Sequence, residues 1–153
     1  MNATNAIDLL RSDHLKVREL LAELATLRTA VPRRAELVGL IKRELLVHAT
    51  LEEEIFYPVF RESGDGEHER LFHEAHEAHR AIEKLILPDL EATDAARDEF
   101  RGRAKVLCEL IERHTEEEER EIFPRATQAL TDAELERVGL RIERRKLELI
   151  ELL

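Results

Sequence analysis

The sequence predicts an all-α protein, an up-down four-helix bundle with an additional C-terminal helix. Apolar residues recur at intervals of three and four along almost the whole chain, which is the helical period. Gly (5) and Pro (4) are too scarce in 153 residues for a strand-and-turn fold. The breaks between helices are short, and short connections favour antiparallel neighbours. We expect one bundle over residues 1–130 and a C-terminal helix over 131–153.

The first two predicted helices each place a histidine on an apolar stripe. His14 lies in the first stripe, which comprises Ile7, Leu10, Val17, Leu21 and Leu24. Val31-Pro32 breaks this run, and proline suits the first turn of the next helix. The second stripe comprises Leu37, Ile41, Leu45, Ile55 and Val59, with His48 and Glu52 on the same face. Both helices therefore direct polar groups towards the bundle interior.

The remaining elements follow from turn and capping signals. A turn at 63–66 precedes a third helix, which we expect from about 67 to 87, ending near Pro88. Thr93-Asp94 is the expected N-cap of a fourth helix. A capping box from Thr131 to Glu134 opens the fifth helix, whose apolar residues must cover either the bundle or a second subunit. The sequence thus allows a monomer or a homodimer through this helix.

Composition and charge narrow the classes of partner that the chain is expected to bind. The chain has 24 basic and 34 acidic residues, a net charge of −10, and no basic block, which argues against nucleic-acid or anionic-membrane binding. No apolar stretch reaches the ~20 residues of a membrane span. Residues 1–14 lack the pattern of a signal peptide, and the single Cys108 excludes an intrachain disulfide. We expect a cytoplasmic protein that acts on small molecules.

The chain contains an internal repeat. The segment from Asp13-His14 matches the segment from Ala78-His79 in its histidine and in three following apolar positions, at an offset of 65 residues. His48-x3-Glu52 leading to Pro58 recurs as His114-x3-Glu118 leading to Pro124, at an offset of 66. One helix pair therefore resembles a duplicate of the other.

Spacing predicts that these histidines lie at one level of the bundle. Antiparallel helices bring residues level when they are equally far from the connecting loop. The midpoints between successive histidines of the series His14, His48, His79 and His114 fall at 31, within 63–66, and just past Thr93-Asp94. Each glutamate follows its histidine by one turn and about 40°. A buried carboxylate must be neutralised, paired or bound to metal, so we expect a metal site.

The order His, His-x3-Glu, His, His-x3-Glu, with Ile55-Phe-Tyr-Pro58 and Ile122-Phe-Pro124 closing the halves, resembles the hemerythrin-like (HHE) family. The resemblance covers about residues 5 to 128. It implies a four-helix bundle around two non-haem iron ions, bridged by carboxylates and optionally by an oxo group. The implied terminal ligands are His14, His48, His79 and His114, and the implied bridges are Glu52 and Glu118.

The third helix departs from the pattern of the oxygen-carrying hemerythrins. Those proteins have two histidines spaced by four on that helix and an aspartate five residues after the last histidine. Here the third helix offers His73, His76 and His79, and Glu118 comes four residues after His114. His76 lies about 60° from His79 and is an expected additional ligand, whereas His73, at about 120°, is a weaker candidate. The departure leaves oxidase- or peroxidase-like chemistry open.

Other polar residues receive simpler interpretations. His68, beside the turn, is expected at the surface. Tyr57 lies about 180° from His48 on an ideal helix, so packing or exposure is expected unless Pro58 redirects it. Glu44 is a candidate partner for His48, and Cys108 is interpreted as a small buried hydrophobe. The charged runs form an expected solvated face in which some members could accept hydrogen bonds from ligand histidines; they comprise Glu53, Glu54, Glu116, Glu117 and Glu119.

Imidazoles with bridging carboxylates suit iron, with zinc or manganese as chemical alternatives. The favoured hypothesis is a di-iron protein that binds or reduces O2, hydrogen peroxide or NO, including catalase-like peroxide disproportionation. The alternatives are a non-catalytic iron- or redox-responsive binding module and a reversible O2 carrier. A purely structural bundle is the third interpretation, and it predicts no metal.

Overall fold

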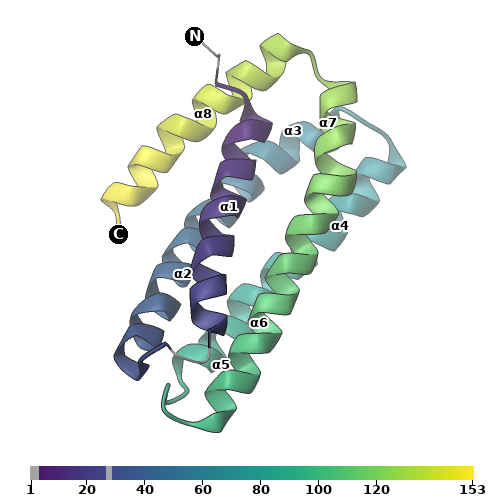
Figure 1. The fold of residues 1–153 in the computed structure, drawn as a ribbon. Helices are drawn as coiled ribbons and strands as arrows, with labels where there is room; N and C mark the ends of the chain where they lie inside the picture. Colours follow the sequence, from purple (N-terminus) through teal and green to yellow (C-terminus); the bar gives the residue numbers. More distant parts are fainter. Residues whose placement is uncertain (1–3, 27–28) are drawn as a thin grey trace.

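The computed structural model describes residues 4–26 and 29–153, and every regular element in these ranges is a helix (Figure 1). The all-α prediction is confirmed. Residues 1–3, where the segment considered as a signal peptide begins, lie outside the described residues. The α-helices are α1 (Ala6–Ala25), α2 (Val31–Leu51), α3 (Tyr57–Glu62), α4 (Gly66–Ala81), α5 (Leu87–Glu91), α6 (Asp98–Glu117), α7 (Phe123–Ala129) and α8 (Asp132–Glu151).

Three π-helical turns join these helices into long rods. The turns Glu52–Phe56, Ile82–Ile86 and Glu118–Ile122 connect α2 to α3, α4 to α5 and α6 to α7. With α1, the three rods form an up-down four-helix bundle, along which α8 runs beside α1 and α2 (Figure 1). The four-helix arrangement with an appended C-terminal helix is therefore as predicted.

Each π turn ends directly before a proline-containing pair: Tyr57-Pro58, Leu87-Pro88 or Phe123-Pro124. Proline has no N–H, and its ring collides with the carbonyl four residues earlier in a regular helix. The wider turn accommodates this, since the residue before each proline donates its N–H to the carbonyl five residues back. The rods consequently continue through their prolines. The third predicted helix, expected to about 87 or a little beyond, ends at Glu91.

The expected caps have different outcomes. The capping box at the start of α8 is confirmed, with Thr131 and Glu134 bonded reciprocally. The expected N-cap at Thr93-Asp94 is wrong, because α6 begins at Asp98 after Arg97. Asp94 instead accepts a hydrogen bond from the backbone N–H of Ala96 at 2.9 Å, which stabilises a turn before the helix.

Helix α8 covers the bundle of its own chain. Leu135, Val138 and Ile142 are buried in the same apolar cluster as Phe56 and Phe123. Gly139 allows close contact with the segment before α1, because a Cβ there would lie 2.4 Å from the Thr4 carbonyl oxygen. The outer face of α8 keeps exposed apolar side chains, Leu140, Leu147 and Ile150. Of the helices described, none is long and apolar enough to cross a membrane.

The core consists of two apolar clusters with a polar layer between them. On each rod one histidine separates the clusters. In α1, for example, Leu10 belongs to the first cluster and Val17 to the second, with His14 between them. In α6 and α7, His114 lies between Ile111 and Phe123. The fold therefore places a layer of buried histidines between two apolar clusters.

Candidate metal centre

Six buried side chains converge in the polar layer: His14, His48, His79, His114, Glu52 and Glu118. Their exposed fractions range from 0% for both glutamates to 8% for His114. Their nitrogen and oxygen atoms form two groups, each with all atoms within 4.8 Å of one another. The first group is His14, His48, Glu52 and Glu118; the second is Glu52, His79 and His114. All six came from the sequence analysis, and the structure brings them together.

Several of these atoms are buried without a hydrogen-bond partner among the residues that the structure describes. They are both carboxylate oxygens of Glu52, Oε1 of Glu118 and Nε2 of His114. Glu52 Oε1 lies 3.0 Å from His48 Nε2 and 3.3 Å from His79 Nε2, and Glu118 Oε1 lies 3.1 Å from His114 Nε2. Leaving buried carboxylates unsatisfied is costly. Close, misaligned donor atoms of this kind fit metal coordination, in which lone pairs point at a common cation.

Three of the histidines contact a carboxylate through Nδ1, the ring nitrogen that faces away from the cluster. His14 Nδ1 lies 3.0 Å from Glu119 Oε1, and His79 Nδ1 lies 2.9 Å from Glu53 Oε1. His48 Nδ1 lies 3.1 Å from Asp13 Oδ2. An imidazole that donates its Nδ1 proton outwards presents the Nε2 lone pair inwards, which is the form that binds metal. Glu53 and Glu119 were among the expected acceptors, whereas Asp13 was missed.

Without metal, protons balance the buried carboxylates. Burial opposes a charge on His48, but the negative charge of Glu52 and a hydrogen bond to Asp13 raise its pKa well above the ordinary value. Against the same effect of burial, the nearby carboxylates of Glu52 and Glu53 raise the pKa of His79 to about 10. The charge of His114 and hydrogen bonds within the cluster hold the pKa of Glu118 well below its ordinary value despite burial. Cations could replace these protons.

Tyr57 lies at the site, because the redirection near Pro58 that the sequence left open does occur. Tyr57 is fully buried, and its hydroxyl donates to Glu118 Oε2 at 3.1 Å and lies 3.4 Å from His79 Nε2. The π turn Glu52–Phe56 inserts one extra residue per turn, which rotates the following residues by about 100° relative to an ideal helix. Burial and the charges of Glu118 and Glu52 raise the pKa of this hydroxyl well above its ordinary value, so it keeps its proton.

The other histidines lie outside the converging cluster. His76 Nδ1 is 3.0 Å from Glu53, and its side chain is 45% exposed; it therefore supports the acceptor of His79. His73 is exposed and pairs with Glu69 at 3.1 Å. His68 is not at the surface as expected: it is buried, stacks on Phe60 and bonds the Phe60 carbonyl at 2.9 Å.

The remaining candidates have ordinary surroundings. Glu44 pairs with Lys16 at 2.8 Å, so the expectation that it supports His48 is wrong. Glu54 pairs with Arg145 of α8 at 2.8 Å, and Glu117 pairs with Arg113 at 3.1 Å. Glu116 is exposed, and Cys108 is partly buried against the second apolar cluster. None of these side chains belongs to either candidate ligand group.

A small cavity lies against the cluster. Its volume is about 30 Å³, and all four histidines of the candidate ligand groups line it together with apolar side chains such as Val17, Leu45 and Ile111. One partly buried carboxyl, that of Glu83, also borders this space, and burial raises its pKa. The cavity is large enough for one or two water-sized molecules, since a single water needs roughly 10–15 Å³ of such volume.

Comparisons with known proteins identify the family. Residues 5–126 match the model of the hemerythrin HHE cation binding domain. The chain belongs to the hemerythrin HHE cation-binding family. The resemblance inferred from the paired His-x3-Glu motifs is therefore confirmed.

The HHE chain is also similar to two individual proteins. A hemerythrin HHE cation binding domain-containing protein from Mycobacterium kansasii has a similar crystal structure, with a TM-score of 0.82 and 25% identity over 95% of this chain and 86% of that one. A protein named DNA nickase from Nostoc sp. is 32% identical over 121 residues, 78% of this chain. The matched region covers 32% of the length of that curated relative, so the HHE chain spans about a third of it.

Proposed function

We propose that this HHE protein is a non-haem di-iron protein that binds or reduces small oxygen species. The observation that supports it is the pair of buried donor groups that share Glu52, with four donor atoms left unsatisfied. His14 and His48 would hold one ion, His79 and His114 the other, and Glu52 and Glu118 would bridge them. His76, half-exposed and bonded to Glu53, would act through that carboxylate instead of as a ligand.

Ligand chemistry supports iron. Imidazole nitrogens with bridging carboxylates suit iron, whereas structural zinc favours closed sites with four ligands to a single ion. Six side chains spread over two ions leave open coordination positions. When bound, an iron pair supplies one or two electrons to a small ligand and takes them back.

The cavity supports O2, hydrogen peroxide and NO as the ligands. Its volume of about 30 Å³ admits molecules of two heavy atoms and excludes organic substrates. Apolar walls limit the access of bulk water. Small molecules would then be the protein's partners. We also propose the cytoplasm as its location.

Catalase-like turnover is the most economical reaction. Two hydrogen peroxide molecules become two water molecules and one O2, so no external reductant is needed. The first peroxide gains two electrons and two protons, and the second loses the same number. The chain supplies groups that can exchange protons: the Tyr57 hydroxyl donates to Glu118, and the Glu83 carboxyl borders the cavity. Both groups have raised pKa values, because burial disfavours their charged forms.

The name of the Nostoc relative gives little support for a nickase role in this chain. Nicking requires approach to the DNA phosphate backbone, which lysine and arginine favour and a net charge of −10 opposes. We therefore retain the proposal of a protein without nucleic-acid binding.

The test is peroxide turnover by the iron-loaded protein. The purified chain is loaded anaerobically with Fe(II), desalted, and assayed for O2 release from hydrogen peroxide at an oxygen electrode. Release that disappears in the double variant His14→Ala/Glu52→Ala, while helical content is retained, is the expected result. Tight iron binding with reversible O2 uptake and no release would favour the carrier, and a metal-dependent change of conformation without either would favour the binding module.

A further inference from the structure

The two repeats build nearly the same half-site, with one break in the support of the histidines. His14 is held by Glu119 and its counterpart His79 by Glu53, and these two acceptors are themselves counterparts in the repeat. His48 is held by Asp13. In the other repeat, Ala78 occupies the position of Asp13, so His114 has no equivalent carboxylate.

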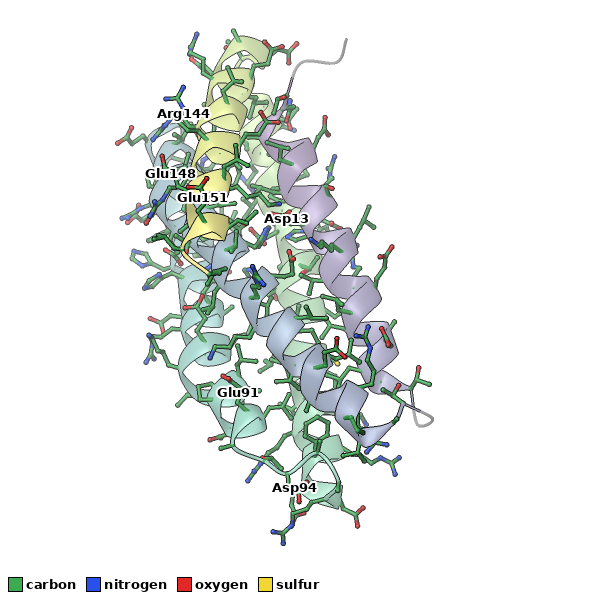
Figure 2. The ribbon with its side chains drawn as sticks, turned by 90° about the vertical axis from the view of Figure 1, so that its left-hand side faces the viewer. Asp13, Glu91, Asp94, Arg144, Glu148 and Glu151 are labelled. Carbon is green, nitrogen blue, oxygen red and sulfur yellow. The ribbon has the colours of Figure 1, made fainter. Side chains whose placement is uncertain are left out.

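Helix α8 completes the support of His48. Lys146 donates a hydrogen bond to Oδ1 of Asp13, while Oδ2 of the same carboxylate faces His48 Nδ1. Figure 2 shows Asp13 in the space between α1 and α8. The side chain of Asp13 is 8% exposed and that of Lys146 is 33% exposed.

A groove borders the side of His114, although its side chain is 9% exposed and that of His48 is 8% exposed. His114 and Ala78 line one groove of about 490 Å³, together with Leu110 and Glu117. Among the described residues, the contacts of the His114 ring are with His79, at 4.6 Å between ring centroids, and with Glu118. Among the described residues, no carboxylate therefore holds Nδ1 of His114 as Asp13 holds Nδ1 of His48.

We propose that the Lys146–Asp13 pair makes the two metal positions unequal. The position at His48 binds its metal first and tightly, and the position at His114 binds second and more weakly. This proposal rests on the proposed two-metal centre. Its physical basis is that an imidazole fixed by an outer acceptor loses less rotational freedom and is a better donor when it binds metal.

Cobalt(II) titration of the full chain tests the proposal, because the visible absorption of cobalt(II) reports on binding and coordination. The wild-type protein is expected to bind in two steps. Lys146→Met keeps the length of the side chain but removes the donor, and it should weaken the first step about 10- to 100-fold without changing the second. Lys146→Arg should restore most of the loss. Ala78→Asp, which copies Asp13 into the other repeat, should strengthen the second step.

Arg145→Met is the matched control. Arg145 neighbours Lys146 on α8 and its side chain is 31% exposed. It binds Glu54 at 2.8 Å, and Glu54 makes no side-chain hydrogen bond to a candidate ligand among the described residues. Both variants remove one ion pair between α8 and the bundle, and only Lys146→Met should change cobalt affinity. Thermal stability should fall more in Lys146→Met, because Asp13 is 8% exposed and Glu54 is 46% exposed. In the zinc-loaded protein, the His48 Nδ1 proton should exchange with water faster in Lys146→Met than in Arg145→Met.

The outcomes separate this proposal from the one on which it rests. Failure of the wild-type chain to bind cobalt, zinc or iron would overturn the two-metal centre. Two bound ions of equal affinity, or equal losses in Lys146→Met and Arg145→Met, would overturn the inequality of the positions and leave the centre standing.

Discussion

The two halves of the bundle share a plan but differ in what surrounds it. In each half a histidine is held by a glutamate of the other half, and an aromatic ring stacks on that histidine. Phe123 stacks on His14 with ring centroids 5.6 Å apart, and Tyr57 stacks on His79 at 5.5 Å. This symmetry shows that a duplicated helix pair provides the converging donors from one motif used twice.

The differences lie at two positions of the repeat. Asp13 corresponds to Ala78, and Tyr57 corresponds to Phe123. The first difference gives a fixed support to His48 alone, and the second gives a hydroxyl to the side of His79 alone. Under the proposals above, these two positions outside the donor set would make the halves unequal, one favouring retention of metal and the other the reaction.

The largest expected effect follows removal of the carboxylate common to both donor groups. Glu52→Ala should abolish binding at both positions, because Glu52 belongs to each group and is fully buried between them. Metal analysis after gel filtration measures this. Glu54→Ala removes an exposed carboxylate two residues away and should retain full metal content; equal loss in both variants would contradict the assignment.

The next effect concerns the hydroxyl of Tyr57. Tyr57→Phe makes the two halves alike at this position, keeps the stacking on His79, and removes the hydroxyl proton beside Glu118. We expect unchanged iron content and peroxide turnover lower by about 10²-fold, within the range of general acid catalysis. Steady-state O2 release at matched iron content measures it. Turnover at the wild-type rate would show that the hydroxyl only fills space.

A smaller and symmetric effect is expected for the two glutamates that hold histidines across the repeat. Glu53→Gln and Glu119→Gln should each lower metal affinity about 10-fold, the lower end of the range for outer partners. Competition with a chelator gives the affinities. Glu117→Gln, on the exposed face, is the control. A tenfold loss in one variant with none in the other would break the proposed symmetry.

The most gradual effect is on the stability of the metal-free chain. The raised pKa of His79 contributes stability that is complete below the unfolded value of about 6.5 and is lost as pH rises towards about 10, and the raised pKa of His48 acts in the same direction. The lowered pKa of Glu118 acts at the other end, so its contribution is lost in acid. Thermal melts of the metal-free protein should therefore decline from pH 6.5 to 10. The metal-loaded protein should decline less, since its imidazoles are already deprotonated; parallel declines would contradict this.

The sequence predicted the level of the site better than its surroundings. The distances of the four histidines from their loops predicted one common layer, because helix rise is uniform and the connections are short. The orientation of Tyr57 was left open, since a π turn cannot be read from apolar spacing. The prolines six residues after Glu52 and Glu118 were the available signal.

Long-range partners were harder to predict. The contact of Lys146 with Asp13 joins residues 133 positions apart and depends on how α8 docks, which apolar spacing leaves open. Asp13 itself had a signal, namely a carboxylate at a position where the repeat has alanine. His68 was placed at the surface because it follows a turn, whereas Phe60 and its carbonyl provide a buried contact.

The most direct test of the account is the Mössbauer spectrum of the chain loaded with iron-57, together with iron per chain. The account predicts about two iron ions per chain and two quadrupole doublets of equal area, because a carboxylate-bridged pair occupies unequal halves. Two ions with a single doublet would show that the halves are equivalent. A chain that takes up one iron ion or none, or that retains only zinc, would contradict the di-iron centre itself.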